Sequence, residues 1–303
     1  MHTIRITETN MTQNANPLAG AFRKPKSYAR LLGLDIGAYP EGFIKAANEL
    51  QEIGVKAMTG QDELLLNNPD AILNGEAIVE VMRSCCPEIE DPTKLLQADV
   101  KLLMTHIRKN SFGSETEIES TCPKCDNKMT LVLDLDGVIG SATQFVDGVE
   151  KVQLDDGLSV TLRPKTFEEY RKILYRGFKE MQSIKALANP DMDEESRLKQ
   201  FGKMFNDMAD LNYDMTVGSV LAVEYNGQLV DDKTYISEFI AELDMTGAKA
   251  LKDAIDVLDQ VGVHAEIPTQ CTNDKCKHEY KEPVNFDQMT FFTESLERKT
   301  KTQ

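Results

Sequence analysis

Two close pairs of cysteines constrain this chain more than any other feature of its sequence. Cys122 and Cys125 have two residues between them, and Cys271 and Cys276 have four. A structural zinc ion takes four thiolate or imidazole ligands in a tetrahedron, and two cysteines on one tight turn supply half of such a set. We therefore predict that the four cysteines together hold one structural zinc ion.

Because the two pairs are far apart in sequence, a shared ion must offset the entropy cost of closing a long loop. Cys125 and Cys271 are 146 residues apart. Closing a loop of that length costs the chain roughly 5 kcal/mol of entropy. Structural zinc contributes on the order of 10–16 kcal/mol in small peptides, which outweighs that cost. A shared ion would therefore clamp two distant parts of the chain together.

Other roles for these side chains stay open at the level of sequence. Each pair could form a disulfide within its turn, act as a redox-active dithiol, or be a former site that has lost its metal. A redox role requires a helix that begins at the first cysteine, and none is expected at Cys122. His278 could replace a cysteine as ligand, although a solvated turn residue is the simpler interpretation. Cys85 and Cys86 end a predicted helix, where buried thiols act as small hydrophobic groups.

Helix signals dominate the chain before the first cysteine pair. Thr59 and Asp62 form a capping box, which predicts a helix start. Apolar residues at helical spacing predict further helices at about 70–86 and 93–108. Strands are expected on either side of the cysteines, at 116–121 and 129–135.

After residue 148 we expect hairpins and helices in alternation. Asp156-Gly157 and Asn226-Gly227 are typical two-residue hairpin turns. A second capping box, Thr166 to Glu169, predicts the start of a long helix. Further helices are expected at 194–211, 233–242 and 245–260, and a strand at 264–269 leads to the second cysteine pair.

The two halves resemble degenerate copies of one unit. In each, a Glu-Ile pair precedes the first cysteine, and an aspartate, Asp136 or Asp287, lies eleven residues after the second. We therefore predict an α+β fold of two related helix-rich units, each with short β-hairpins and a cysteine knuckle, joined by the zinc site. The expected segments are a flexible N-terminal arm (1–25), a first unit (26–148), a second unit (149–290) and a charged C-terminal tail (291–303).

Composition argues against several functional classes. The 303 residues include 50 acidic and 34 basic side chains, and the net charge of -16 disfavours binding to a phosphate backbone. No run approaches the ~20 apolar residues of a membrane-spanning helix, and the N-terminus lacks the apolar core of a signal peptide. The sequence has no glycine-rich phosphate loop, no GxSxG and no HExxH motif. We expect a reduced intracellular protein that is not an enzyme and has no small-molecule substrate.

Several stretches between residues 50 and 136 carry a resemblance to a known family. They are the segment 58–63, the helix end near Cys86, Leu96-x-Ala-Asp99 with Leu102 and Leu103, Ile107-Arg108, Ser111, Gly113, and the knuckle Cys122-Pro-x-Cys125. In these residues the chain resembles the baseplate hub assembly proteins of T-even-like contractile-tailed phages. The second half shows a fainter likeness, and the four residues between Cys271 and Cys276 depart from the usual two.

The resemblance implies a non-catalytic protein that acts in tail baseplate assembly and binds other phage tail and baseplate proteins. It implies a location in the host cytoplasm during assembly, and possible retention in the virion tail baseplate. The exposed apolar edges of the hairpins and the N-terminal arm are the expected contacts. One alternative is a permanent structural component of the virion baseplate. Another, from a different class, is a zinc-ribbon adaptor that binds nucleic acid, against which the net charge argues.

Overall fold

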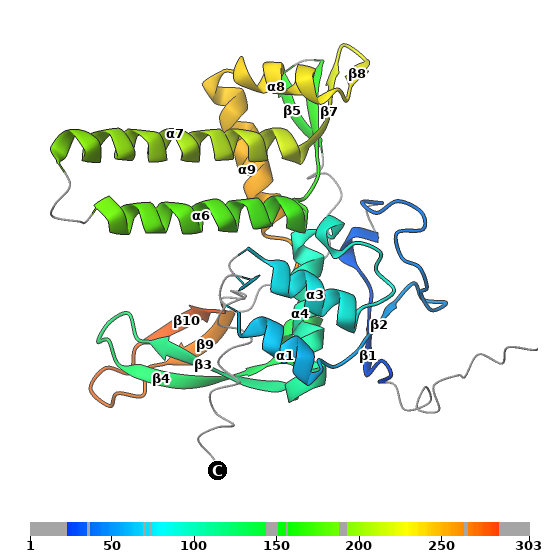
Figure 1. The fold of residues 1–303 in the computed structure, drawn as a ribbon, viewed down its shortest axis with the longest axis vertical. Coiled ribbons are helices and arrows are strands. Elements are labelled where there is room, and N and C mark those ends of the chain that lie inside the picture. The colour runs from blue at the N-terminus through cyan, green and yellow to red at the C-terminus, as the bar shows by residue number, and fades with distance from the viewer. Residues whose placement is uncertain are drawn as a thin grey trace, which may run out of the picture.

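Helices and short antiparallel strands alternate along the whole chain (Figure 1). The computed structural model describes residues 23–34, 37–68, 71–72, 74–143, 151–155, 157–187, 193–263 and 266–284. The predicted α+β class is confirmed. Most of the expected N-terminal arm and the whole of the expected C-terminal tail lie outside the described residues.

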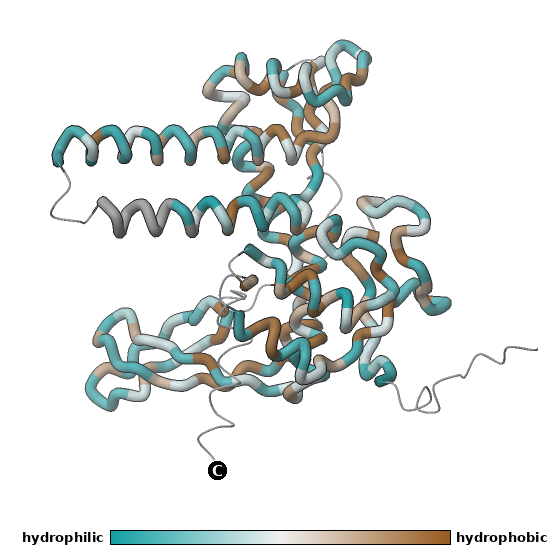
Figure 2. Tube along the Cα trace, viewed as in Figure 1, coloured by the Kyte–Doolittle hydropathy of each residue, from teal (hydrophilic) through white to brown (hydrophobic). Residues whose placement is uncertain are grey.

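The first part of the chain forms a helical body around one apolar core. Its helices are α1 (Gly60–Leu66), α3 (Glu76–Cys85) and α4 (Gln97–Phe112), with 3-10 turns at η2 (Leu32–Leu34) and η3 (Pro92–Lys94). Strands β1 (Ser27–Ala29) and β2 (Ile53–Val55) pair antiparallel beside them. Because most of α4 is buried, including Leu103 and Ile107 at 0% exposure, this helix is the centre of the body. Figure 2 shows hydrophobic residues concentrated there.

A buried carboxylate fixes the segment before β2 onto α4. Asp99 is 0% exposed and accepts hydrogen bonds from the amides of Leu32 at 2.5 Å and Gly33 at 3.1 Å. It also accepts one from the Tyr39 hydroxyl at 2.9 Å, and burial together with the Asp99 charge raises the pKa of Tyr39. A Cβ at Gly33 would lie 2.6 Å from the Tyr39 ring, so only glycine fits this close approach.

Ordered contacts begin inside the expected N-terminal arm. The Arg23 guanidinium donates to the Ser84 carbonyl at 2.6 Å and lies 3.4 Å from the Asp62 carboxylate. Asp62 belongs to the predicted capping box, which the structure confirms: its amide donates to the Thr59 hydroxyl, and its carboxylate accepts from the Thr59 amide.

Two hairpins leave the helical body side by side (Figure 1). The first consists of β3 (Glu115–Thr121) and β4 (Lys128–Asp134), followed by the short helix α5 (Leu135–Gly140). The second consists of β9 (Glu266–Gln270) and β10 (Glu279–Pro283), near the end of the described chain. The strands predicted around both cysteine pairs are therefore confirmed, within one or two residues for the first hairpin.

The chain between these hairpins builds a second layer with its own core. Four antiparallel strands follow the order β5-β6-β7-β8: β5 (Lys151–Asp155), β6 (Leu158–Leu162), β7 (Val220–Tyr225) and β8 (Gln228–Val230). Along the chain, β6 and β7 are separated by helices α6 (Phe167–Leu187) and α7 (Glu194–Ser219). These two helices form a long antiparallel pair (Figure 1). Helices α8 (Lys233–Ala241) and α9 (Met245–Asp259) complete the layer. The core is formed by Val160, Leu162, Val220, Val223, Ile236, Leu251, Ile255 and Leu258.

The start of α6 joins the two layers. Phe167 is fully buried in the core of the helical body, and its amide donates to the Leu95 carbonyl at 2.7 Å. The second predicted capping box is confirmed here, with the Thr166 amide donating to the Glu169 carboxylate at 2.9 Å. The division into units at 26–148 and 149–290 stays a prediction. Across the described residues, no helix has both the length and the apolar character of a membrane span.

A four-cysteine candidate metal centre

The first cysteine pair lies on the tight turn between β3 and β4. The Cys122 amide donates to the Asn127 carbonyl at 2.9 Å, and the Asp126 amide donates back to the Cys122 carbonyl at 3.0 Å. Asp126 adopts a left-handed conformation with φ of 56°, which an aspartate tolerates better than most residues. The turn thus brings Cys122 and Cys125 to the same end of the hairpin.

The second pair repeats this backbone arrangement despite its longer spacing. The Cys271 amide donates to the His278 carbonyl at 2.9 Å, as the Cys122 amide does to Asn127. Lys277 follows Cys276 with φ of 44°, the place that Asp126 takes in the first turn. The additional residues form a local turn in which the Cys276 amide donates to the Asn273 carbonyl at 2.9 Å. The two knuckles are therefore alike around the cysteines, as the sequence repeat predicts.

The four sulfur atoms converge on one point. The Sγ atoms of Cys125 and Cys271 are 3.6 Å apart, those of Cys122 and Cys276 are 3.9 Å apart, and all four lie within 4.8 Å of one another. In a tetrahedron with Zn–S distances of about 2.3 Å, the sulfurs are about 3.8 Å apart. A disulfide needs sulfurs at about 2.05 Å, and all four cysteines are free thiols. The cluster can therefore hold a metal ion.

Direct contacts between the hairpins hold the cluster in register. The Ser120 hydroxyl lies 2.7 Å from the Tyr280 hydroxyl and donates to the Glu282 carboxylate at 2.5 Å. The Asn127 amide group donates to the Thr272 hydroxyl at 3.0 Å. A small apolar group, formed by Met129, Leu131 and Tyr280, packs against the sulfurs. Sequence reasoning did not identify these contacts, because serine, tyrosine, glutamate and asparagine are common residue types that, unlike the cysteines, give no signal of a distant partner.

Burial and hydrogen bonds from backbone amides have opposite effects on the pKa values of the cysteine thiols. Burial opposes ionisation of Cys122, but the amides of Lys124 and Cys125 donate to its sulfur, and they lower its pKa to about 7. Burial, together with hydrogen bonds from the neighbouring sulfurs, raises the pKa of the Cys271 thiol to about 12. Without a cation, four thiolates this close would repel one another, so a bound cation would allow all four to ionise together.

The remaining candidate ligands lie outside the cluster. His278 stacks on Tyr280, with ring centroids 6.0 Å apart. Cys85 and Cys86 are both buried in the core of the helical body, and burial raises the pKa of the Cys85 thiol to about 11. In the part of the chain that the structure describes, the four predicted cysteines form the single group with metal-binding geometry.

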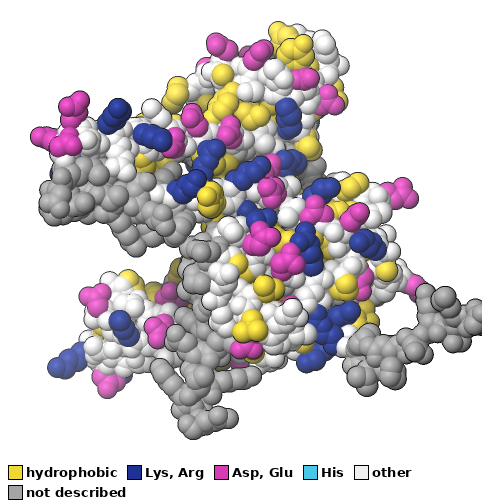
Figure 3. Space-filling model, in the orientation of Figure 1, with side chains coloured by type: hydrophobic (Ala, Val, Ile, Leu, Met, Phe, Trp, Pro, Cys, Tyr) yellow, Lys and Arg dark blue, Asp and Glu magenta, His cyan; other side chains and the backbone are white. Residues whose placement is uncertain are grey.

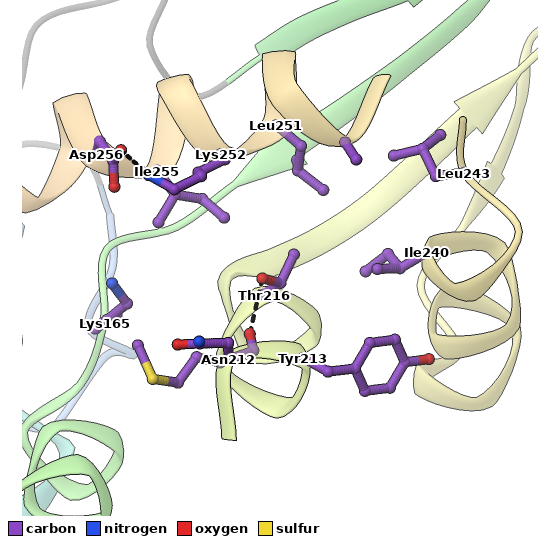
Figure 4. A pocket seen from close by; sticks show the side chains of 12 residues that line it. Lys165, Asn212, Tyr213, Thr216, Ile240, Leu243, Leu251, Lys252, Ile255 and Asp256 are labelled. Atoms are coloured by element: carbon purple, nitrogen blue, oxygen red, sulfur yellow. Dashed lines mark hydrogen bonds and ion pairs between the residues drawn. The ribbon is translucent and has the colours of Figure 1, made fainter. Parts of the chain in front are cut away.

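A pocket of about 420 Å³ lies between α7, α8 and α9 and was not predicted from the sequence (Figure 4). Ile240, Leu243, Leu251 and Ile255 give it mainly apolar walls. Its cationic Lys252 pairs with Asp256 at 2.5 Å. The pocket therefore has the character of a cleft for apolar groups.

The fold and site define an α+β protein whose two hairpins surround four converging cysteines. The chain belongs to the T4 bacteriophage base plate protein family, whose model matches residues 43–293. Membership indicates a structural or assembly role in the baseplate of a T4-like phage and contacts with other tail proteins, and such families are typically structural rather than enzymatic. Comparison with curated proteins gave no match. Comparison with solved structures gave none either.

Proposed function

We propose that this chain is a non-enzymatic protein that acts in baseplate hub assembly by binding other tail proteins. The observation that carries the proposal is the family match over residues 43–293, which includes both cysteine knuckles. The proposal places the chain in the host cytoplasm during assembly. The alternative is that the chain is a permanent virion component. The two roles differ in whether the chain remains in the finished baseplate.

We further propose that the ion is zinc, held by Cys122, Cys125, Cys271 and Cys276. Four thiolates at tetrahedral distances suit zinc, which has no redox chemistry and needs no open coordination position in a structural site. Four protein ligands leave no place for a water or substrate, so the ion would act as a clamp and not as a catalyst.

The clamp would present the two hairpins as one binding element. Val132 of β4 is 60% exposed, although the cluster and the body cover other apolar side chains of the same hairpin. Two hairpins held rigid by the ion lose little conformational entropy when a partner binds. This rigidity, and not the single exposed Val132, supports the proposal that partners bind through the hairpins.

The proposal is tested by affinity capture of the tagged full-length chain from infected host cells. We expect baseplate proteins to be captured with the wild type and to be lost with Cys122→Ser/Cys271→Ser. A Cys85→Ala chain is the matched control, since it removes a thiol outside the cluster. Capture of the same baseplate proteins by the double variant would contradict a role for the clamp, and capture of none by the wild type would contradict the function itself.

Purified virions separate the two assembly roles. A hub assembly factor is expected in baseplate intermediates and absent from mature particles by mass spectrometry. Its presence in mature particles at a fixed copy number would instead support the permanent component.

A further inference from the structure

Two sulfur contacts in the cysteine cluster join one hairpin to the other. The Sγ atoms of Cys125 and Cys271 are 3.6 Å apart, and those of Cys122 and Cys276 are 3.9 Å apart. Each contact links a cysteine of the β3–β4 turn to a cysteine of the β9–β10 turn, and together the two contacts use every cysteine of the cluster once. We call Cys125/Cys271 and Cys122/Cys276 the cross-hairpin pairs.

Each cross-hairpin pair combines a partly exposed cysteine with a buried one. Cys125 and Cys276 are partly exposed, whereas Cys122 is 0% exposed and Cys271 3%. The ends of both hairpins project away from the helical body on the face seen in Figure 3. A small oxidant in solution therefore reaches one thiol of each pair first, and the second thiol lies beside it. An accessible thiol with a neighbouring thiol that can resolve it is typical of cysteines that oxidise reversibly to disulfides.

Contacts that involve no cysteine keep the cross-hairpin pairs opposite each other. The Ser120 hydroxyl donates to the Glu282 carboxylate at 2.5 Å, and the Asn127 amide group donates to the Thr272 hydroxyl at 3.0 Å. These hydrogen bonds remain when the thiols react. A disulfide has sulfurs about 2.05 Å apart, so each pair has to close by about 1.5 to 1.9 Å, which rotation of the cysteine side chains can supply.

We propose that a hydroperoxide converts the cluster into two disulfides, Cys125–Cys271 and Cys122–Cys276, which keep the hairpins joined. The inference rests on the proposed four-cysteine site and adds a covalent form of the same clamp. Disulfides are stable in oxidising surroundings, such as those of a virion outside the host cell. Because the bridged residues are 146 and 154 positions apart, the disulfides would close the same long loop as the ion.

The chemistry takes place in two steps in each pair. The partly exposed thiolate attacks hydrogen peroxide, so that an S–O bond forms, the O–O bond breaks and the second oxygen leaves as water after it takes up a proton. The buried thiolate then attacks the oxidised sulfur, which forms the S–S bond and displaces the hydroxyl group as a second water. For each disulfide, two thiols lose two electrons and two protons, and one hydrogen peroxide is reduced to two waters.

Peptide mapping of the full-length chain after treatment with hydrogen peroxide tests the proposal. The reduced protein, purified without chelator, is oxidised under native conditions, the remaining thiols are alkylated, and the chain is digested with trypsin. Trypsin cleaves after Lys124 and Lys275, so each cysteine of the cluster lies on a peptide of its own. We expect the two cross-hairpin pairs as the main disulfides, with loss of bound zinc as they form. Cys85→Ala, which removes a thiol outside the cluster, should give the same map.

Amide hydrogen exchange shows whether the disulfides act as a clamp. The hairpins should stay protected in the oxidised chain without zinc, and they should lose protection in the reduced chain treated with a chelator. Equal loss of protection in both forms would overturn the clamp role of the disulfides.

The disulfide map and the zinc content of the reduced chain fail independently. Disulfides within the knuckles, Cys122–Cys125 or Cys271–Cys276, as the main products overturn the inference, and so does a cluster that loses its zinc but forms no disulfide. Such a result in a chain that held zinc before oxidation leaves the metal proposal intact. Cross-hairpin disulfides in a chain that never held zinc support the inference and contradict the metal proposal.

Discussion

His106 is a buried histidine whose charge state ties the stability of the helical body to pH. It is 7% exposed on α4, and its Nδ1 lies 3.2 Å from the Ser27 hydroxyl. Burial, aided by the Lys109 charge, lowers its pKa from 6.5 to about 4. Asp136 and Glu52 act in the opposite direction but are outweighed. The imidazole is therefore neutral in the folded protein at pH 7.

We predict that His106 makes the protein less stable as the pH falls from about 6.5 towards 4. In this window the unfolded chain binds a proton that the folded protein excludes, so the free energy of unfolding decreases with falling pH. The loss should be on the order of 3 kcal/mol, because one pKa unit corresponds to about 1.4 kcal/mol. Urea unfolding at several pH values, compared with His106→Gln, isolates this contribution from the carboxylates. Parallel curves for the two proteins would contradict the assignment.

At the scale of elements, the two capping boxes show how local sequence sets helix starts. Thr59 with Asp62 begins α1, and Thr166 with Glu169 begins α6, in both cases by reciprocal side-chain and backbone hydrogen bonds. We predict that Thr59→Ala and Thr166→Ala each lower the free energy of unfolding by about 1 kcal/mol. The two losses should add, because the boxes lie on different helices.

Thr→Ser at each position is the matched control, since serine keeps the capping oxygen. Chemical denaturation should place each serine variant close to the wild type. Equal losses for serine and alanine would show that the methyl group, and not the cap, stabilises the helix start.

Features set by neighbouring residues were predicted more accurately from the sequence than features set by long-range contacts. The Asn226-Gly227 hairpin turn was predicted correctly, because its positive φ values of 50° and 81° suit these two residues. The helix expected from about 93 instead begins at Gln97. Leu95 and Leu96 fit the helical period, but a β-bridge between Leu96 and Thr166 holds them extended. That long-range pairing leaves no trace in the local pattern.

Helix α7, in contrast, is longer than the sequence predicts. It was expected to end near residue 211 and extends to Ser219. Several residues with low helix propensity, such as Asn212 and Asp214, weaken the local signal there. Packing of this part of α7 against α6, α8 and α9 outweighs their preference, because tertiary contacts supply most helix stability in proteins.

The convergence of the four cysteines could be anticipated because residue type and spacing carry the signal, and their binding of a metal stays a prediction. Cysteine pairs on short turns identified all four members of the cluster. The hydrogen bonds of Ser120 with Tyr280 and Glu282 were not predicted, since common residue types at such separations give no signal. The pocket between α7, α8 and α9 was missed for the same reason.

For the whole molecule, the central claim is that one ion joins two hairpins that are far apart in sequence. The sheet and helices α6 to α9 lie between the two knuckles along the chain, so the clamp would close a loop around the entire second layer. Removing the ion should lower the free energy of unfolding by several kcal/mol, because an ion that binds only the folded chain adds its binding free energy to the stability. The hairpins should then exchange amide protons faster, while the core of the helical body stays protected.

The most direct test of this claim is the metal content of the full-length chain, purified under reducing conditions without chelator and measured by elemental mass spectrometry. We predict one zinc per chain in the wild type and in Cys85→Ala. Cys122→Ser/Cys271→Ser should contain none and should unfold less cooperatively. A wild type without bound metal, or a double variant that keeps its zinc, would contradict the clamp.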